Sequence, residues 1–67
     1  MGTHEYYEIN LPEYLQHDLD AMKKGDEPYD CLWGELYGSI NCAYIDGDIT
    51  EEHAWYLREK YLNMERV

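Results

Sequence analysis

The sequence predicts an all-α fold, a small three-helix domain with a helix hairpin and an extended or flexible N-terminal segment. Apolar residues recur at helical spacing within residues 11–24, 29–45 and 50–64, which are the three expected helices. Glycine and acidic residues, which are typical of helix ends and caps, mark the two turns between these stretches. The 67 residues leave room for one domain, 1–67, with a thin core, because such a chain buries only about 60% of its unfolded surface.

The first expected helix, residues 11–24, has signals at both ends. Asn10 can cap it, Pro12 needs no amide hydrogen in the first turn, and Glu13 can complete a capping box. Gly25 is the expected stop, and two lysines before it favour the negative end of the helix dipole. The apolar stripe consists of Leu11, Leu15, Leu19 and Met22.

The second expected helix, residues 29–45, follows the turn at residues 25–28, which offers acidic caps and a first-turn proline. Its apolar stripe consists of Leu32, Trp33, Leu36, Ile40, Ala43 and Tyr44. Because this stripe is the richest of the three, we expect the second helix to be the most buried.

The third expected helix, residues 50–64, follows the sharpest turn signal in the chain. Gly47 suits a left-handed C-cap, and Asp48 or Thr50 can cap the next helix. Ile49 is expected to fill the end of the resulting helix hairpin. The apolar stripe consists of Ala54, Leu57, Tyr61 and Leu62.

Residues 1–9 have no helix signal of this kind. Tyrosine and isoleucine in this segment favour a strand, but the chain offers no second strand to pair with it. Two alternatives therefore stay open, an extended segment that lies over the helices and a flexible arm.

The negative charge of the chain disfavours some classes of binding partner. Fifteen acidic and five basic residues give a net charge of -10, which repels phosphate backbones and anionic lipid. We therefore expect no direct contact with nucleic acid or membrane. The chain has no apolar run of membrane-spanning length and no export signal, and its two cysteines are too few for a disulfide scaffold, so we expect a cytoplasmic protein.

Candidate chemistry is sparse. Cys31 and Cys42 would stand about 16 Å apart along one helix, too far to bond, and are expected to be buried small apolar residues. His4, His17 and His53 lie in separate segments without metal-ligand spacing, so we expect solvent-facing side chains. The turn at residues 46–48 is not an EF-hand calcium loop, because its neighbours do not place ligand residues at the positions that such a loop requires. We therefore predict no metal, no cofactor and no enzyme activity, because so small a bundle has little room for a catalytic pocket.

Two features instead indicate a contact surface. Gly34, Gly38 and Cys42 recur every four residues, so something is expected to approach the second helix closely, either another helix of this chain or a second copy or foreign helix. Eight tyrosines and two tryptophans with no phenylalanine favour either a binding face or the edge of the core. This aromatic set comprises Tyr6, Tyr7, Tyr29, Tyr37, Trp55 and Tyr56. The candidate interaction residues are Gly34, Tyr37, Gly38, Trp55 and Tyr56.

The turn and the third helix also carry a resemblance. Residues 47–52, followed by Ala54, Leu57 and residues 60–62, resemble the Gly-x-Ile-Thr-x-Glu-Glu helix hairpins of short bacterial oligomerisation domains. The whole chain is similar in style to small acidic uncharacterised proteins carried by conjugative elements and phages of Gram-positive (Firmicutes) bacteria. The resemblance implies a bacterial accessory protein of a mobile element, and it implies no catalytic residue.

The leading hypothesis is a non-enzymatic module for protein–protein interaction or self-association. The alternative is an acidic nucleic-acid mimic that inhibits a DNA-binding host protein. The mimic requires its acids to line one continuous surface, whereas acids scattered among helix starts favour capping and solubility. These acids are Glu5, Glu8, Asp18, Asp20, Asp26, Glu27 and Asp30.

Overall fold

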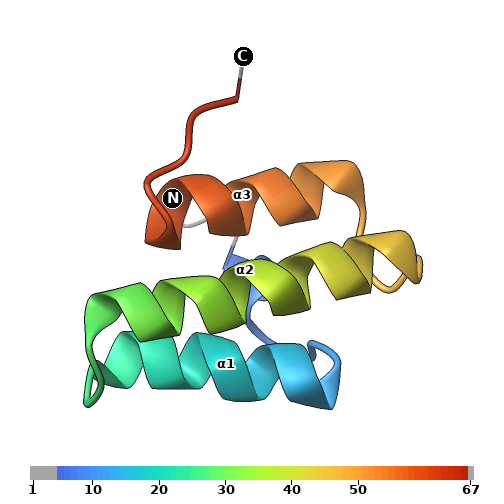
Figure 1. Ribbon diagram of the computed structural model, residues 1–67. Coiled ribbons are helices and arrows are strands. Elements are labelled where there is room, and N and C mark those ends of the chain that lie inside the picture. The colour runs from blue at the N-terminus through green and yellow to red at the C-terminus, as the bar shows by residue number, and fades with distance from the viewer. Residues whose placement is uncertain (1–4, 67) are drawn as a thin grey trace.

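Helix α2 lies between α1 and α3 in the computed structural model, which describes residues 5–66 (Figure 1). The elements are the 3-10 helix η1 (Glu5–Glu8) and the α-helices α1 (Glu13–Lys24), α2 (Tyr29–Ile45) and α3 (Glu51–Tyr61). Successive α-helices run in opposite directions, so α1 with α2 and α2 with α3 form two helix hairpins. The predicted three-helix class is confirmed.

The start of α1 differs from the expected one. Asn10 has a φ of 56°, in the left-handed region, and the N-cap position belongs to Pro12, whose side chain makes no cap hydrogen bond. The predicted capping box at Asn10 is therefore wrong, because Asn10 is used to turn the chain from η1 into α1. The predicted stop is confirmed, since Gly25 has a φ of 70° and donates its amide to the Ala21 carbonyl at 2.9 Å.

The turn between α2 and α3 follows the sequence prediction closely. The C-cap of α2 is Asp46, and Gly47, the predicted C-cap, takes the left-handed φ of 81° one residue later. The Thr50 hydroxyl accepts a hydrogen bond from the His53 amide at 3.1 Å. Ile49 is buried and closes this end of the hairpin. At its other end α3 stops at Tyr61, earlier than residue 64, and Asn63 takes a left-handed φ of 57°.

The core is built from the predicted stripes. Fully buried leucines of α1 meet the apolar side of α2, and α3 closes the other side of α2. The buried core residues are Leu15, Leu19, Leu32, Leu36, Ile40, Ala43, Ile49, Ala54, Leu57 and Leu62. With principal extents of 27 × 26 × 25 Å, the bundle has one small core in which α2 contributes most.

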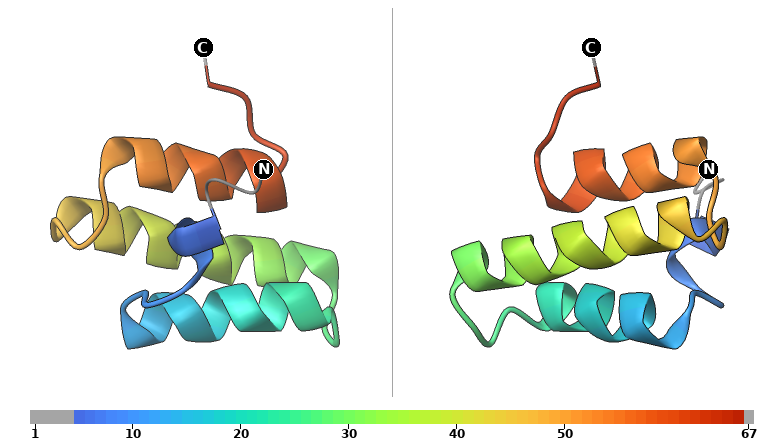
Figure 2. Two further views of the ribbon diagram at one scale, coloured as in Figure 1. Left: turned by 180° about the vertical axis from the view of Figure 1, so that it is seen from behind. Right: turned by 45° about the vertical axis from the view of Figure 1, so that its right-hand side comes forward.

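The N-terminal segment lies across the back of the bundle. Glu5–Glu8 form a single turn of 3-10 helix, and the rear view shows this turn lying over α2 in the space between α1 and α3 (Figure 2). Residues 5–8 are therefore helical and packed, where an extended stretch was one of the two alternatives. Residues 1–4 lie outside the described part of the chain.

Candidate functional site

The side of α2 that faces away from the core is open. At 100° per residue, Gly34 and Gly38 lie opposite the buried Leu36 and Ile40. The exposed residues on this side are Cys31, Gly34, Gly38, Cys42 and Ile45, which we call the open face of α2. Ile45 is 79% exposed, although isoleucine is among the residues most often buried.

The two glycines of the open face have no packing role within the bundle. A Cβ atom built on Gly34 or on Gly38 would meet no other atom within 4 Å. Of the two explanations for the small residues, close approach by another helix of the same chain is therefore wrong for residues 5–66. The physical reason is that α1 and α3 both pack on the opposite, leucine-rich side of α2.

The cysteines are also on the open face. Cys31 and Cys42 are both free and exposed, so the expectation that they would be buried is wrong. The buried side of α2 contains Leu32, Leu36 and Ile40. Because α2 is rotated so that these residues face the core, both thiols face solvent. The open face therefore combines small side chains, two thiols and an exposed isoleucine, with the exposed acids Asp30 and Glu35 of α2 beside it.

The aromatic residues expected to share this surface are dispersed. Tyr37 is half-buried and stacks on Trp33, with ring centroids 5.0 Å apart, and the Trp33 indole donates to the Leu62 carbonyl at 3.0 Å. Trp55 is half-buried on α3, where the guanidinium groups of Arg58 and Arg66 lie 4.8 Å and 5.5 Å from the ring centroid. Most of these rings act as the edge of the core, which was the second alternative for the aromatic set.

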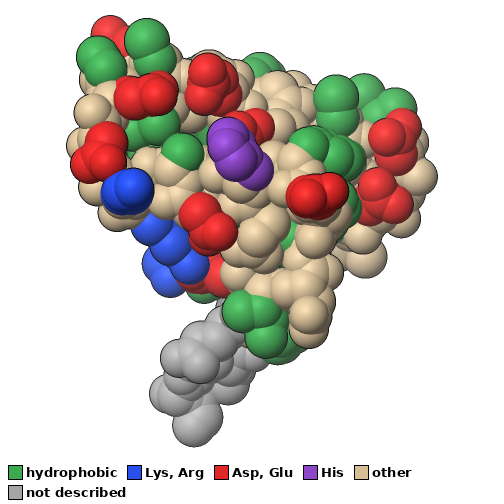
Figure 3. Space-filling view, turned by 90° about the horizontal axis from the view of Figure 1, so that it is seen from below, with side chains coloured by type: hydrophobic (Ala, Val, Ile, Leu, Met, Phe, Trp, Pro, Cys, Tyr) green, Lys and Arg blue, Asp and Glu red, His purple; other side chains and the backbone are tan. Residues whose placement is uncertain are grey.

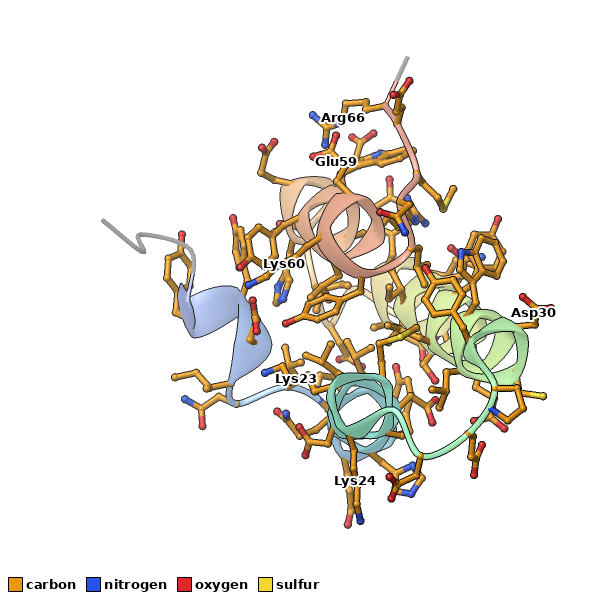
Figure 4. The ribbon with its side chains drawn as sticks, turned by 90° about the vertical axis from the view of Figure 1, so that its left-hand side faces the viewer. Lys23, Lys24, Asp30, Glu59, Lys60 and Arg66 are labelled. Carbon is orange, nitrogen blue, oxygen red and sulfur yellow. The ribbon has the colours of Figure 1, made fainter. Side chains whose placement is uncertain are left out.

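Tyr56 belongs to a cluster on the opposite side of the bundle, centred on the Glu8 carboxylate. This carboxylate accepts hydrogen bonds from the Lys60 ammonium at 2.5 Å and from the hydroxyls of Tyr56 at 2.5 Å and Tyr61 at 2.6 Å. Lys23 of α1 forms an ion pair with it at 3.0 Å. Lys23 and Lys60 both lie on the side of the helices that faces η1, whereas Lys24 points away from it (Figure 4).

The cluster shifts the pKa values of Glu8, Lys60 and Tyr61. Burial of Glu8 opposes ionisation, but the bonds from Lys60, Tyr56, Tyr61 and Lys23 outweigh it and hold the pKa of Glu8 well below its usual range. The same contact with Glu8 raises the pKa of Lys60. Burial, with the bond to Glu8, raises the pKa of Tyr61 to about 12. At neutral pH the cluster is therefore an ionised carboxylate bound by two ammonium groups and two protonated phenols.

His53 supports the same segment from α3. Its Nε2 donates to the Tyr7 carbonyl at 2.7 Å, and its ring stacks on the Tyr7 ring with centroids 4.2 Å apart. Burial lowers the pKa of His53, and the bond to the Tyr7 carbonyl partly opposes this shift. The expectation of a solvent-facing side chain is wrong for His53 and confirmed for the exposed His17, while His4 lies outside the described residues.

The acids do not form one continuous surface. The Glu8 carboxylate is turned toward the cluster described above, and that of Asp18 accepts a short hydrogen bond from Ser39. On the α1 side, acidic side chains are separated by uncharged ones, with Lys and Arg side chains toward one edge (Figure 3). Three acids line a shallow hollow of about 330 Å³, whose walls are His17, Asp20, Ala21, Lys24, Asp26, Glu27 and Leu32.

Several kinds of site are not found among the described residues. No group of three His, Cys, Asp or Glu side chains in residues 5–66 is arranged to hold a metal ion. Within the same range, every helix is too short or too polar to cross a membrane.

Neither a protein-family model, nor a curated protein, nor a solved structure matches the chain.

Proposed function

We propose that this chain is a non-enzymatic interaction module that self-associates, or binds a protein partner, through the open face of α2. The observation that carries the proposal is the empty space at Gly34 and Gly38, two glycines in the interior of the longest helix. A glycine inside a helix costs about 0.8–1 kcal/mol relative to alanine. Nothing in the described bundle offsets this cost, and the close approach of another helix would.

The geometry of helix packing explains why glycines suit such a contact. Interaxial distances of about 8–10 Å depend on the side chains at the crossing point, so two glycines one turn apart permit a close crossing. Cys31 and Cys42 lie on the same side of α2, and Ile45 at its end can fill the hollow left by a glycine of the facing helix. The open face thus has both a small centre and a protruding apolar end.

Charge favours this face over the others. Two copies with a net charge of -10 each repel one another wherever their acidic surfaces meet. The five residues of the open face are uncharged, and the exposed acids Asp30 and Glu35 of α2 lie on either side of it, so contact at its centre brings few like charges together. We further propose that the protein acts in the bacterial cytoplasm as an accessory protein of a mobile element, which its acidic composition and its resemblance support.

Light scattering over a concentration series tests the proposal. We expect the wild-type mass to rise from 8.1 kDa toward twice that value, and the double variant Gly34→Gln/Gly38→Gln to show a much smaller rise over the same concentrations. Glu59→Gln is the matched control, because it places the same side chain at an exposed helical position of α3 and should leave association unchanged. A wild-type mass of 8.1 kDa at every concentration contradicts self-association.

The nucleic-acid mimic is the second candidate. The hollow on the α1 side, with Asp20, Asp26 and Glu27 on its walls, is the observation that favours it. The inward-turned Glu8 and Asp18 weigh against it, because they offer no phosphate-like charge to a partner. The test is competition with a DNA duplex for a basic DNA-binding protein of a Gram-positive host. A mimic displaces the duplex at low salt and loses this ability as salt rises, whereas failure to displace it at low salt contradicts mimicry.

A further inference from the structure

Four side chains on α1 and α3 form a site for one carboxylate. They are Lys23 of α1 and Tyr56, Lys60 and Tyr61 of α3, and we call them the cradle. All four converge on the Glu8 side chain, with donor-to-oxygen distances from 2.5 to 3.0 Å. Two of the five basic residues of a strongly acidic chain are thus committed to a single carboxylate.

The donor set has a defined chemistry. Two ammonium groups supply charge-assisted hydrogen bonds, and two phenols supply neutral donors, so that both oxygens of a carboxylate are satisfied. Lys60 and Tyr56 bind one oxygen of Glu8, while Tyr61 and Lys23 bind the other. The Glu8 side chain is only 11% exposed as a result. The cradle therefore fits a glutamate presented on a short helical turn.

Glu8, which occupies the cradle, belongs to η1, whereas the cradle residues belong to α1 and α3. η1 is joined to α1 by residues 9–12, and its contacts with the bundle are made chiefly with α3. In this linker Ile9 is 56% exposed, and Asn10 holds a left-handed φ of 56°. A left-handed conformation is unfavourable for any residue other than glycine, although asparagine tolerates it best. The linker therefore stores strain in the closed arrangement.

We propose that η1 exchanges between two copies of the chain, so that Glu8 of one copy occupies the cradle of the other. The exchanged dimer keeps the Glu8 contacts, the bond between His53 and the Tyr7 carbonyl, and the stacking of their rings, all made between copies. An exchange of identical elements needs no new contact surface, and opening the linker releases Asn10 from its left-handed turn. This inference goes beyond the open face of α2, because exchange uses the opposite side of the bundle.

Charge reversal on the two sides of the contact tests the exchange. Glu8→Lys places a third cation among the cradle lysines, and Lys23→Glu/Lys60→Glu places two acids around Glu8. Each variant alone loses its own closed arrangement through like-charge repulsion. In an equimolar mixture, however, lysine 8 of one chain can bind the acidic cradle of the other, and Glu8 of the second chain can bind the intact cradle of the first.

We expect the mixture to form a heterodimer with twice the mass of the monomer and a thermal midpoint above that of either variant by about 5 °C or more. The matched control mixes Glu59→Lys with Lys24→Glu/Arg66→Glu, which has the same net charges but reverses residues outside the cradle. This control mixture should show no gain in mass or in thermal midpoint over its two separate components. A cradle mixture that melts and scatters as the sum of its two components overturns the proposal.

Exchange in the wild-type protein is tested by isotope-filtered NMR on a mixture of labelled and unlabelled chains at millimolar concentration. We expect contacts between the Tyr7 ring of one copy and the His53 ring of another. Their absence overturns the exchange. A wild-type dimer that survives Glu8→Lys but is lost in Gly34→Gln/Gly38→Gln also overturns it, while leaving association through the open face intact.

Discussion

The side of the bundle under η1 and the open face of α2 differ in charge and in how their surfaces are closed. Under η1, polar groups from three elements satisfy one another around Glu8, and the segment from the N-terminal end of the chain covers the helices. On the open face, small side chains and an exposed isoleucine lie next to solvent, with empty space above both glycines. The polar groups under η1 are thus bound by other groups of the same chain, whereas the open face of α2 is not covered by any described part of the chain.

The largest expected effect compares two isoleucines of the same helix. Ile40 is fully buried and Ile45 is 79% exposed. Ile40→Ala should lower the free energy of unfolding by about 2–5 kcal/mol, because it leaves a cavity in a thin core. Ile45→Ala should change it by less than about 0.5 kcal/mol in the monomer. Urea denaturation at low protein concentration measures both, and equal losses would remove the distinction between the two sides of α2.

The next effect concerns the Glu8 carboxylate. Glu8→Gln keeps the shape of the side chain but removes the charge that Lys23 and Lys60 bind, and should lower the free energy of unfolding by about 1–3 kcal/mol. Glu59→Gln, an exposed glutamate on α3, is the control and should change it by less than about 0.5 kcal/mol. The two variants are compared by urea denaturation at neutral pH. If they are equally stable, the cluster does not fasten η1.

The pH dependence should follow from the same groups. The pKa values of Glu8 and His53 are both lowered in the folded protein, so the unfolded chain binds protons first as the pH falls. Stability should therefore decrease below the ordinary His pKa of 6.5 and decrease further below the ordinary Glu pKa of 4.5. Thermal melts across this range measure it. In Glu8→Gln the loss of stability below pH 4.5 should become smaller. An unchanged loss would show that other carboxylates cause it.

The smallest effect has the opposite sign. Gly38→Ala should raise the free energy of unfolding of the monomer by about 0.5–1 kcal/mol, because alanine favours the helix and its Cβ meets no other atom. Gly47→Ala is the contrasting variant and should be destabilising, since Gly47 has a φ of 81°. Chemical denaturation at low concentration measures both. A destabilising Gly38→Ala would show that the space above α2 is filled in the monomer.

Helical periodicity and local capping chemistry predicted most of the fold. The stripes of Leu15, Leu36 and Leu57 became the core, and Gly25 and Gly47 ended their helices as their conformational freedom predicts. The start of α1 was missed because the strong capping signal of Asn10 is a local preference, whereas Asn10 takes a left-handed φ in the turn between η1 and α1.

The candidate site was less predictable. Gly34 and Gly38 were recognised from their spacing, but the exposure of Cys31 and Cys42 depends on the rotational phase of α2 against both neighbours. The cluster around Glu8 joins residues more than 50 positions apart, as the bond from Lys60 shows, and no local pattern relates them. Long-range polar pairing of this kind is set by how the helices pack, which periodicity alone does not specify.

The rate of thiol alkylation, measured as the protein concentration rises, tests most directly whether the open face of α2 is the contact surface. Cys31 and Cys42 lie on this face and are both exposed in the monomer. The account predicts that both thiols become slower to react as the mass seen by light scattering increases, and that Gly34→Gln/Gly38→Gln abolishes this protection. A dimer in which both thiols react as fast as in the monomer would contradict it.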